Sequence, residues 1–152
     1  MSSWVGVTVA AALHQHCGTT GQGLVFNGEC GYRLFPERPD LVRKPDVSVV
    51  ARPRLPGGKI PTGFFALAPD LAVEVISPRD LFYEVAGKVA DYLAAGVRQV
   101  WVLNPEQRTV TVHTPARVTH LGAPDTLEAG ELLPGFQCRV ADLFPPVEEE
   151  TG

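Results

Sequence analysis

Two short apolar runs, each carrying one acid, dominate the middle of the sequence. Residues 70–76 predict a buried strand with Glu74 near its centre. Residues 45–51 predict a second strand that carries Asp46 at its leading edge. An ionised carboxylate inside a core strand is costly unless it is paired or bound to a cation. Glu74 is therefore expected either to form an ion pair, for instance with Arg98, or to belong to a functional site.

The remaining apolar positions predict two helices and several further strands. Helical spacing predicts helices over 4–16 and 80–95, with Asp80 as the N-cap of the second. Gly18 and Gly96 are expected to end these two helices. Alternating patterns predict short strands over 24–28, 31–35, 98–103 and 108–113. This mixture predicts an α/β or α+β fold in which helices pack on one central sheet.

Length and composition favour one soluble domain. The 152 residues are enough for a hydrophobic core, and no apolar stretch approaches the ~20 residues that span a bilayer. We expect one domain over 1–147 and an acidic tail over 148–152. Three scattered cysteines without a Cys-x-x-Cys pair argue against a zinc site or a disulfide framework. The N-terminus lacks a positively charged leader, so a cytoplasmic protein is expected.

Charge is unevenly distributed along the chain. The net charge of -4 argues mildly against nucleic acid as a partner. However, residues 33–59 hold seven bases and three acids, whereas residues 125–150 hold seven acids and one base. The basic stretch includes a loop rich in Pro and Gly over 52–63. It is either a solvated surface or a nucleic-acid contact, and its candidate phosphate-binding residues are Arg43, Lys44, Arg52, Arg54 and Lys59.

Asp46 and Glu74 could together hold a magnesium ion if their strands are neighbours. Magnesium prefers hard oxygen ligands and is typically held by one or two carboxylates, with its other positions left for water and substrate phosphate. The backbone carbonyl of Val75 could supply a further ligand. Lys88, on the second predicted helix, could orient an attacking water or stabilise developing negative charge. These residue types suit the hydrolysis of a phosphodiester.

Each of these residues also has an ordinary structural explanation. Asp46 could be a turn residue, because it follows Pro45. Lys88 could pair on the helix surface with Glu84 or Asp91, which lie four and three residues away.

The chain resembles the Uma-two-type restriction endonuclease family, of the PD-(D/E)XK nuclease superfamily, over roughly residues 4–145. The resemblance rests on Lys-Pro-Asp-Val at 44–47, Val-Glu-Val-Ile-Ser-Pro at 73–78, Lys88, and the run at 94–105 that contains Gly-Val-Arg-Gln-Val-Trp-Val. It implies a restriction-endonuclease-like core, in which helices flank a central mixed sheet.

The resemblance also implies a function. Asp46 and Glu74 match the two acids of the family, and they would bind Mg²⁺, for which Mn²⁺ can substitute. The superfamily usually places a lysine two residues after the second acid, where this chain has Ile76. This family carries the lysine on the next helix, which matches Lys88. The resemblance therefore implies a DNA endonuclease, with a homodimer expected by analogy.

One departure from the family leaves a second function open. Relatives usually begin with an extra segment before the first helix, and some superfamily members add a helix-borne Glu to the site. This chain has no acid before Glu29. The alternative is a catalytically weak or inactive nucleic-acid-binding or assembly module on the same fold. A third possibility is a dimerisation protein whose interface is the apolar hairpin at 100–112.

Overall fold

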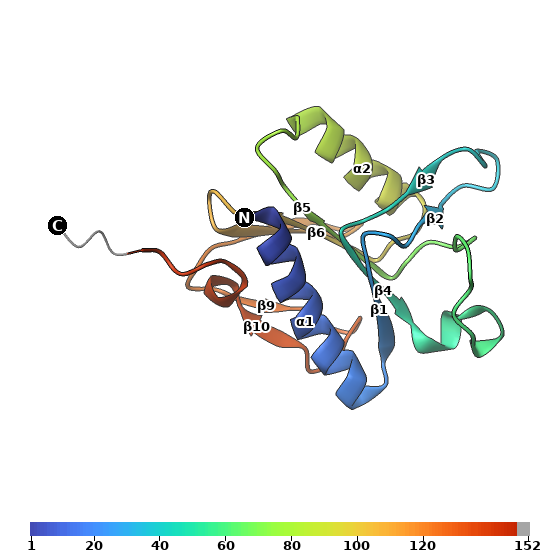
Figure 1. Ribbon diagram of the computed structural model, residues 1–152, viewed down its shortest axis with the longest axis horizontal. Helices are drawn as coiled ribbons and strands as arrows, with labels where there is room; N and C mark the ends of the chain where they lie inside the picture. The colour runs from blue at the N-terminus through green and yellow to red at the C-terminus, as the bar shows by residue number, and fades with distance from the viewer. Residues whose placement is uncertain (149–152) are drawn as a thin grey trace.

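A six-stranded mixed sheet forms the centre of the protein, and the computed structural model describes residues 1–148 (Figure 1). The strand order is β1-β4-β5-β6-β7-β8. Of the predicted acidic tail, residues 149–152 lie outside the described part of the chain. The strands are β1 (Gly23–Asn27), β4 (Val47–Ala51), β5 (Leu71–Val75), β6 (Gln99–Asn104), β7 (Thr109–His113) and β8 (Val118–Leu121).

The direction of β4 and β5 brings the two predicted acids to one end of the sheet. These strands are antiparallel neighbours, with Val47 opposite Val73. Asp46 directly precedes β4 and Glu74 is near the end of β5. Because the two strands run in opposite directions, both acids lie at the same end of this strand pair. All other neighbouring pairs in this sheet are antiparallel too, except β5 and β6, which are parallel. The helix α2 (Phe82–Ala94) connects these two parallel strands.

The helix α1 (Ser2–Thr20) covers one face of the sheet. It buries Val5, Val9, Leu13 and Cys17 against a cluster that includes Trp101. The short strands β9 (Thr126–Glu128) and β10 (Gln137–Arg139) and the 3-10 turn η3 (Val140–Leu143) join the same layer.

The helix α2 covers the other face, together with the hairpin of β2 (Tyr32–Arg33) and β3 (Val42–Arg43). Val89 and Tyr92 of α2 pack in a cluster with Ala72, Val100 and Val102 from the sheet. The basic loop after β4 contains two 3-10 turns, η1 (Arg52–Arg54) and η2 (Pro56–Gly58).

The C-terminus of α1 and the N-terminal cap of α2 differ from the prediction. The helix α1 continues beyond Gly18 to Thr20, and Gly21 ends it in the left-handed conformation with φ 70°. Asp80 does not cap α2, because Leu81 is the N-cap and the Asp80 carboxylate accepts a hydrogen bond from the Ser77 amide. The predicted stop at Gly96 is confirmed by its φ of 94°.

The apolar hairpin of β6 and β7 belongs to the core. Val100, Trp101, Val102 and Val110 are all buried, so these side chains are not available for the dimer interface considered above. Among the helices of residues 1–148, none has the length and apolar character that a membrane crossing requires.

Candidate active site

A hollow of about 520 Å³, where β4 begins and β5 ends, contains the predicted metal-binding and catalytic residues. Asp46, Glu74, Val75 and Lys88 line it together. The opposite wall is the first half of α1, which contributes small or apolar residues such as Gly6. The structure therefore brings together residues from four elements, α1, β4, β5 and α2, that are separate in the sequence.

Glu74 is the buried acid of this hollow, with 7% of its surface exposed. Alternation along β5 directs it to the α2 side of the sheet, away from Val73 and Val75. There the Tyr92 hydroxyl donates a hydrogen bond of 2.7 Å to its Oε1 atom. The suggested ion pair with Arg98 is absent from the described residues, where Arg98 is exposed and the two ion pairs involve other residues.

Asp46 is exposed, but its carboxylate is fixed across the strand boundary. Its Oδ2 atom accepts a hydrogen bond of 2.7 Å from the backbone N–H of Val75. This bond joins the ends of β4 and β5 just beyond the paired residues Val47 and Val73. A residue that only turned the chain after Pro45 would not need this contact, so the Asp46 side chain has a defined position at the mouth of the hollow.

The surroundings of Glu74 disfavour its charged form. Burial raises its pKa most strongly, and the nearby Asp46 carboxylate raises it further. The Tyr92 hydroxyl and the Lys88 ammonium oppose these effects, and the resulting pKa is about 7. Two acids therefore share a site in which their combined negative charge is only partly compensated by the protein.

Lys88 is half-buried and faces the hollow from the middle of α2. Asp91, one of the two partners considered for Lys88, is instead bound to Arg43, with 2.6 Å between Nη2 and Oδ2. Glu84 forms no ion pair within the described part of the chain. The surface pairing considered for Lys88 is therefore not formed, and its ammonium acts on Glu74.

A hard divalent cation fits this donor set. Two carboxylates, Glu74 in the interior and Asp46 at the rim, supply charged oxygen ligands to the same hollow. A third acid that lines it, Asp80, accepts a hydrogen bond from the Ser77 amide. Residues 1–148 contain no cluster of three or more His, Cys, Asp or Glu side chains suited to a metal. The arrangement thus suits a metal that keeps several water ligands, as Mg²⁺ does, and not a closed cage of protein ligands.

The five candidate phosphate-binding cations do not form one surface. Arg52, Arg54 and Lys59 follow β4, so they lie at the opposite end of this strand from Asp46. Arg54 is paired with Asp70 at 2.9 Å, and the Arg52 Nε atom donates to the Gly21 carbonyl. Arg43 is paired with Asp91. Lys44 lies two positions before Asp46 in the chain and takes part in neither of the ion pairs of the described residues.

Tyr92 is the residue of this site that the sequence did not reveal. Its ring is fully buried in the α2 cluster, as expected for a core aromatic. Its hydroxyl, however, is the hydrogen-bond partner of Glu74. Only a general rule could have indicated this contact in the sequence. A buried tyrosine normally places its hydroxyl against a polar group, and Glu74 was the acid expected inside the core.

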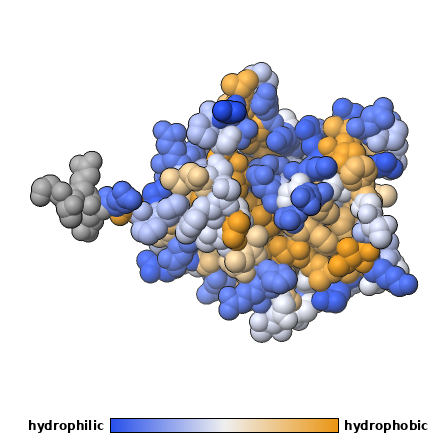
Figure 2. Space-filling view, viewed as in Figure 1, coloured by the Kyte–Doolittle hydropathy of each residue, from blue (hydrophilic) through white to orange (hydrophobic). Residues whose placement is uncertain are grey.

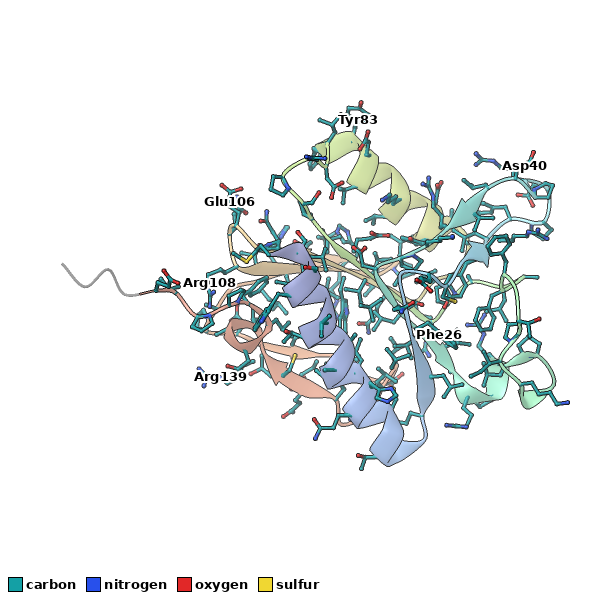
Figure 3. The ribbon with its side chains drawn as sticks, in the orientation of Figure 1. Phe26, Asp40, Tyr83, Glu106, Arg108 and Arg139 are labelled. Carbon is teal, nitrogen blue, oxygen red and sulfur yellow. The ribbon has the colours of Figure 1, made fainter. Side chains whose placement is uncertain are left out.

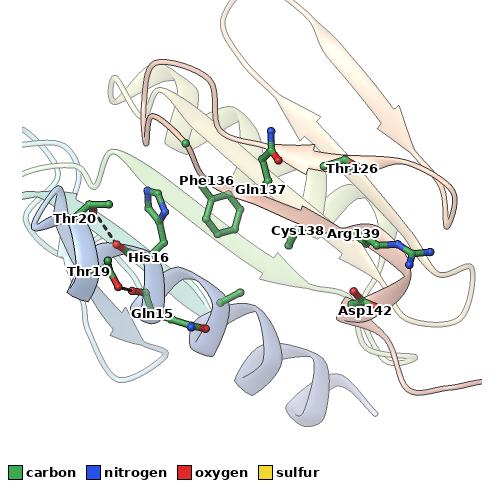
Figure 4. Close-up of a pocket in the computed structure, with 12 residues that line it drawn as sticks. Gln15, His16, Thr19, Thr20, Thr126, Phe136, Gln137, Cys138, Arg139 and Asp142 are labelled. Atoms are coloured by element: carbon green, nitrogen blue, oxygen red, sulfur yellow. Dashed lines mark hydrogen bonds between the residues drawn. The ribbon is translucent and has the colours of Figure 1, made fainter.

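A second hollow of about 700 Å³ lies between the C-terminal half of α1 and β10 (Figure 4). Asp142 is the single acid among the residues that line it. His16 points from α1 toward Phe136, and its Nε2 atom is hydrogen-bonded to Gln22. This hollow lacks the paired carboxylates of the first.

Residues 2–141 match the Uma2 family, which is described as "Putative restriction endonuclease". The chain belongs to this family. The match spans α1, the whole central sheet and all the residues of the hollow, so the resemblance in the sequence is confirmed. None of the curated proteins matches the chain.

A solved structure shares the Uma2 chain's fold. It is described as "a putative nuclease belonging to DUF820" from Anabaena variabilis ATCC 29413, with a TM-score of 0.78 and 20% sequence identity. The alignment covers 93% of this chain and 78% of that one. The expected fold class, a mixed sheet flanked by helices as in restriction endonucleases, is thereby confirmed.

Proposed function

We propose that this Uma2 protein is a metal-dependent endonuclease that hydrolyses phosphodiester bonds of DNA. The observation that carries the proposal is the meeting of Asp46, Glu74 and Lys88 in one hollow at the end of β4 and β5. Family membership supports a nuclease, and the donor set supports a hard cation.

The carboxylates of Asp46 and Glu74 would hold Mg²⁺ or Mn²⁺, with the carbonyl of Val75 as a further oxygen donor. When bound, the cation would supply Lewis-acid stabilisation of the negative charge that develops on the phosphate. It would also favour the ionised form of Glu74, against the effect of burial.

The protein's own groups complete the site. Tyr92 fixes the Glu74 carboxylate by its hydrogen bond, and the Val75 amide fixes that of Asp46. Lys88 has an ammonium group directed to the hollow, where it can hydrogen-bond the attacking water or a phosphate oxygen. Hydrolysis forms one bond from the water oxygen to phosphorus and breaks one P–O ester bond, leaving a phosphate monoester and an alcohol.

A nucleic-acid-binding module with weak or no catalysis is the second candidate. The observation in its favour is the α1 wall of the hollow, which has no acidic residue to add to Asp46 and Glu74. A module of this kind would bind DNA without holding a divalent cation at the two carboxylates.

Calorimetric titration of Mn²⁺ separates the two candidates. We expect the wild type to bind Mn²⁺, whereas Glu74→Gln and Asp46→Asn each lose binding because a charged ligand becomes a neutral amide. The matched control is Asp125→Asn, which alters an exposed acid in a turn away from the hollow. DNA cleavage with Mg²⁺ should fall by more than 100-fold in the two site variants, more than the 10–100-fold typical of residues that only support a ligand. A folded wild type that binds no Mn²⁺ would contradict the enzyme and favour the binding module.

A further inference from the structure

An exposed phenylalanine lies between two cations on the side of the molecule that carries β2 and β3. Phe64 has 47% of its surface exposed. The Arg33 Cζ atom is 5.4 Å from the centroid of its ring, and the Lys44 Nζ atom is 5.9 Å away. Figure 2 shows hydrophobic atoms over this hairpin with hydrophilic atoms beside them. Phe64, Arg33 and Lys44 are called the aromatic platform below.

The ring of Phe64 packs closely against Gly31. A Cβ atom at Gly31 would lie 2.6 Å from Cδ1 of Phe64 and 2.9 Å from Cγ1 of Val42. The ring therefore packs directly against backbone, in space that only a glycine leaves free. The hairpin packs against one edge of the ring and the two cations lie over it, while nearly half of the residue's surface remains accessible.

The next residue anchors the platform from below. Phe65 is buried, and its ring stacks on that of Tyr32 with centroids 5.3 Å apart. Its carbonyl accepts a hydrogen bond of 2.8 Å from the Arg33 amide, and its own amide donates to the Gly31 carbonyl. With Phe65 fixed in the core, Phe64 is displayed on a rigid support and not on a loose loop.

The two cations of the platform have no acidic partner. Arg33 and Lys44 are exposed, and the ion pairs found in residues 1–148 join other residues, Arg43 to Asp91 and Arg54 to Asp70. Lys44 also connects the platform to the candidate active site, because it lies two positions before Asp46, a span of at most about 7 Å of chain. Unpaired positive charge around an accessible aromatic ring suits a ligand with both anionic and aromatic parts.

We propose that the aromatic platform binds an unpaired nucleotide of the nucleic-acid substrate next to the bond that is cut. Phe64 stacks on the base, while Arg33 and Lys44 contact flanking phosphates. The inference rests on the proposed nuclease function and adds the substrate class: a strand with unpaired nucleotides at the cleavage site. A duplex would not use Phe64 in this way, because its bases already stack on one another, whereas single strands are bound by such aromatic surfaces.

A purely structural role for Phe64 is the competing explanation, since its ring also covers Gly31 and Val42. Substitutions separate the two. Phe64→Leu keeps an apolar cover but removes the aromatic face, and Phe64→Trp keeps an aromatic face. A structural role predicts that Leu is tolerated and that the effects on DNA binding follow those on thermal stability.

The test is fluorescence anisotropy with labelled 12-nucleotide DNA in EDTA, so that binding is measured without metal and without cleavage. Three probes of this length are used: a single strand, a duplex, and a single strand made of abasic sites. We expect Phe64→Leu to weaken binding of the single strand at least about five-fold, the lower end for loss of one stacked base. Binding of the duplex and of the abasic strand should change less than two-fold, and Phe64→Trp should bind the single strand as the wild type does.

The cations are tested in the same assay. Arg33→Gln should weaken binding of both single-stranded probes and reduce its dependence on salt, because a phosphate contact is lost. Arg139→Gln is the matched control, since Arg139 is an exposed arginine on β10. It lies far from Asp40, which is in the loop between β2 and β3 (Figure 3). It should bind each probe like the wild type.

Two results would overturn the proposal: equal single-strand affinity of Phe64→Leu and wild type, or equal losses with the single strand and the abasic strand. The outcome is independent of the Mn²⁺ titration. DNA binding that depends on Phe64, in a protein that binds no Mn²⁺, would support the platform and contradict the endonuclease. Mn²⁺ binding at the two acids, with DNA binding that does not depend on Phe64, would support the endonuclease and contradict the platform.

Discussion

A buried acid lies near each end of β5, and the two acids have different partners. Asp70 precedes the strand with 5% of its surface exposed, and Glu74 is near its other end with 7% exposed. Asp70 accepts a hydrogen bond of 2.6 Å from the Ala51 amide and is paired with Arg54. Glu74 has a neutral partner, the Tyr92 hydroxyl, and a second acid beside it.

The difference shows how burial alone fails to identify function. At the Asp70 end, an arginine compensates the charge, and the carboxylate tethers the chain where β4 leads into η1. At the Glu74 end, the protein leaves negative charge in excess and opens a hollow beside it. An acid pair whose charge is only partly compensated costs stability, which is a usual property of sites that bind a ligand.

Asp70→Ala should produce the largest change in stability. It leaves the Ala51 amide without its acceptor and Arg54 without its partner, and we expect a loss of about 3 kcal/mol in the free energy of unfolding. Urea denaturation measures it. Asp125→Ala removes a similar hydrogen bond, to the Gly122 amide, at an exposed turn and should cost less than about 1 kcal/mol. Equal losses in both variants would contradict a structural role for Asp70.

Glu74→Gln should act in the opposite direction at neutral pH. The folded protein raises the pKa of Glu74 from its usual 4.5 to about 7. It therefore binds more protons than the unfolded chain between these values, so the free energy of unfolding falls as pH rises through this window. The neutral amide avoids this fall, and the variant should be more stable than the wild type by up to about 3 kcal/mol at pH 8. Near pH 4 the two should be equally stable. A variant less stable than the wild type at pH 8, without metal, would refute this account.

The affinity for Mn²⁺ should depend on pH, because the cation and a proton compete for the Glu74 carboxylate. Below pH 7 the cation must displace a proton from Glu74, so the Mn²⁺ association constant should rise by up to about ten-fold per pH unit and level off above pH 7. Titrations in buffers of different ionisation enthalpy count the released protons. Affinity that stays constant from pH 5.5 to 7.5 would show that Glu74 does not bind the metal.

Tyr92→Phe should have the smallest effect of the series. It removes the hydroxyl that lowers the pKa of Glu74 and orients its carboxylate, while the ring continues to fill the core. We expect the Mn²⁺ affinity at pH 7 to fall about ten-fold, the lower end for a residue that supports a ligand. The loss should shrink at pH 8.5, where Glu74 is ionised in both proteins. A loss that does not depend on pH would indicate that the hydroxyl acts on orientation alone.

The sequence predicted the elements that bury apolar side chains, because burial leaves a periodic pattern. The strands β4, β5, β6 and β7 and both helices were located within a few residues. By contrast, β8 was not predicted, since most of its residues are exposed and it lies at the edge of the sheet, where it pairs with β7.

The site was predicted as a set of residues but not as an arrangement. Asp46 and Glu74 were found because acids stand out in apolar strands, yet strand order and direction depend on contacts that no local pattern records. The same limit explains the basic loop: Arg52 and Lys59 are close to Asp46 along the chain, but β4 separates them from it by its whole length. Tyr92 and Phe64 were not recognised because their roles depend on what the fold places next to them.

The hydrogen bond between Asp46 and Val75 links the chemistry of the hollow to the backbone of the central sheet. Any ligand that draws electron density from this carboxylate must also weaken its hold on the Val75 amide. The resonance of that one backbone proton, at the wall of the hollow, should therefore report in an NMR spectrum whether the acids beside it are occupied.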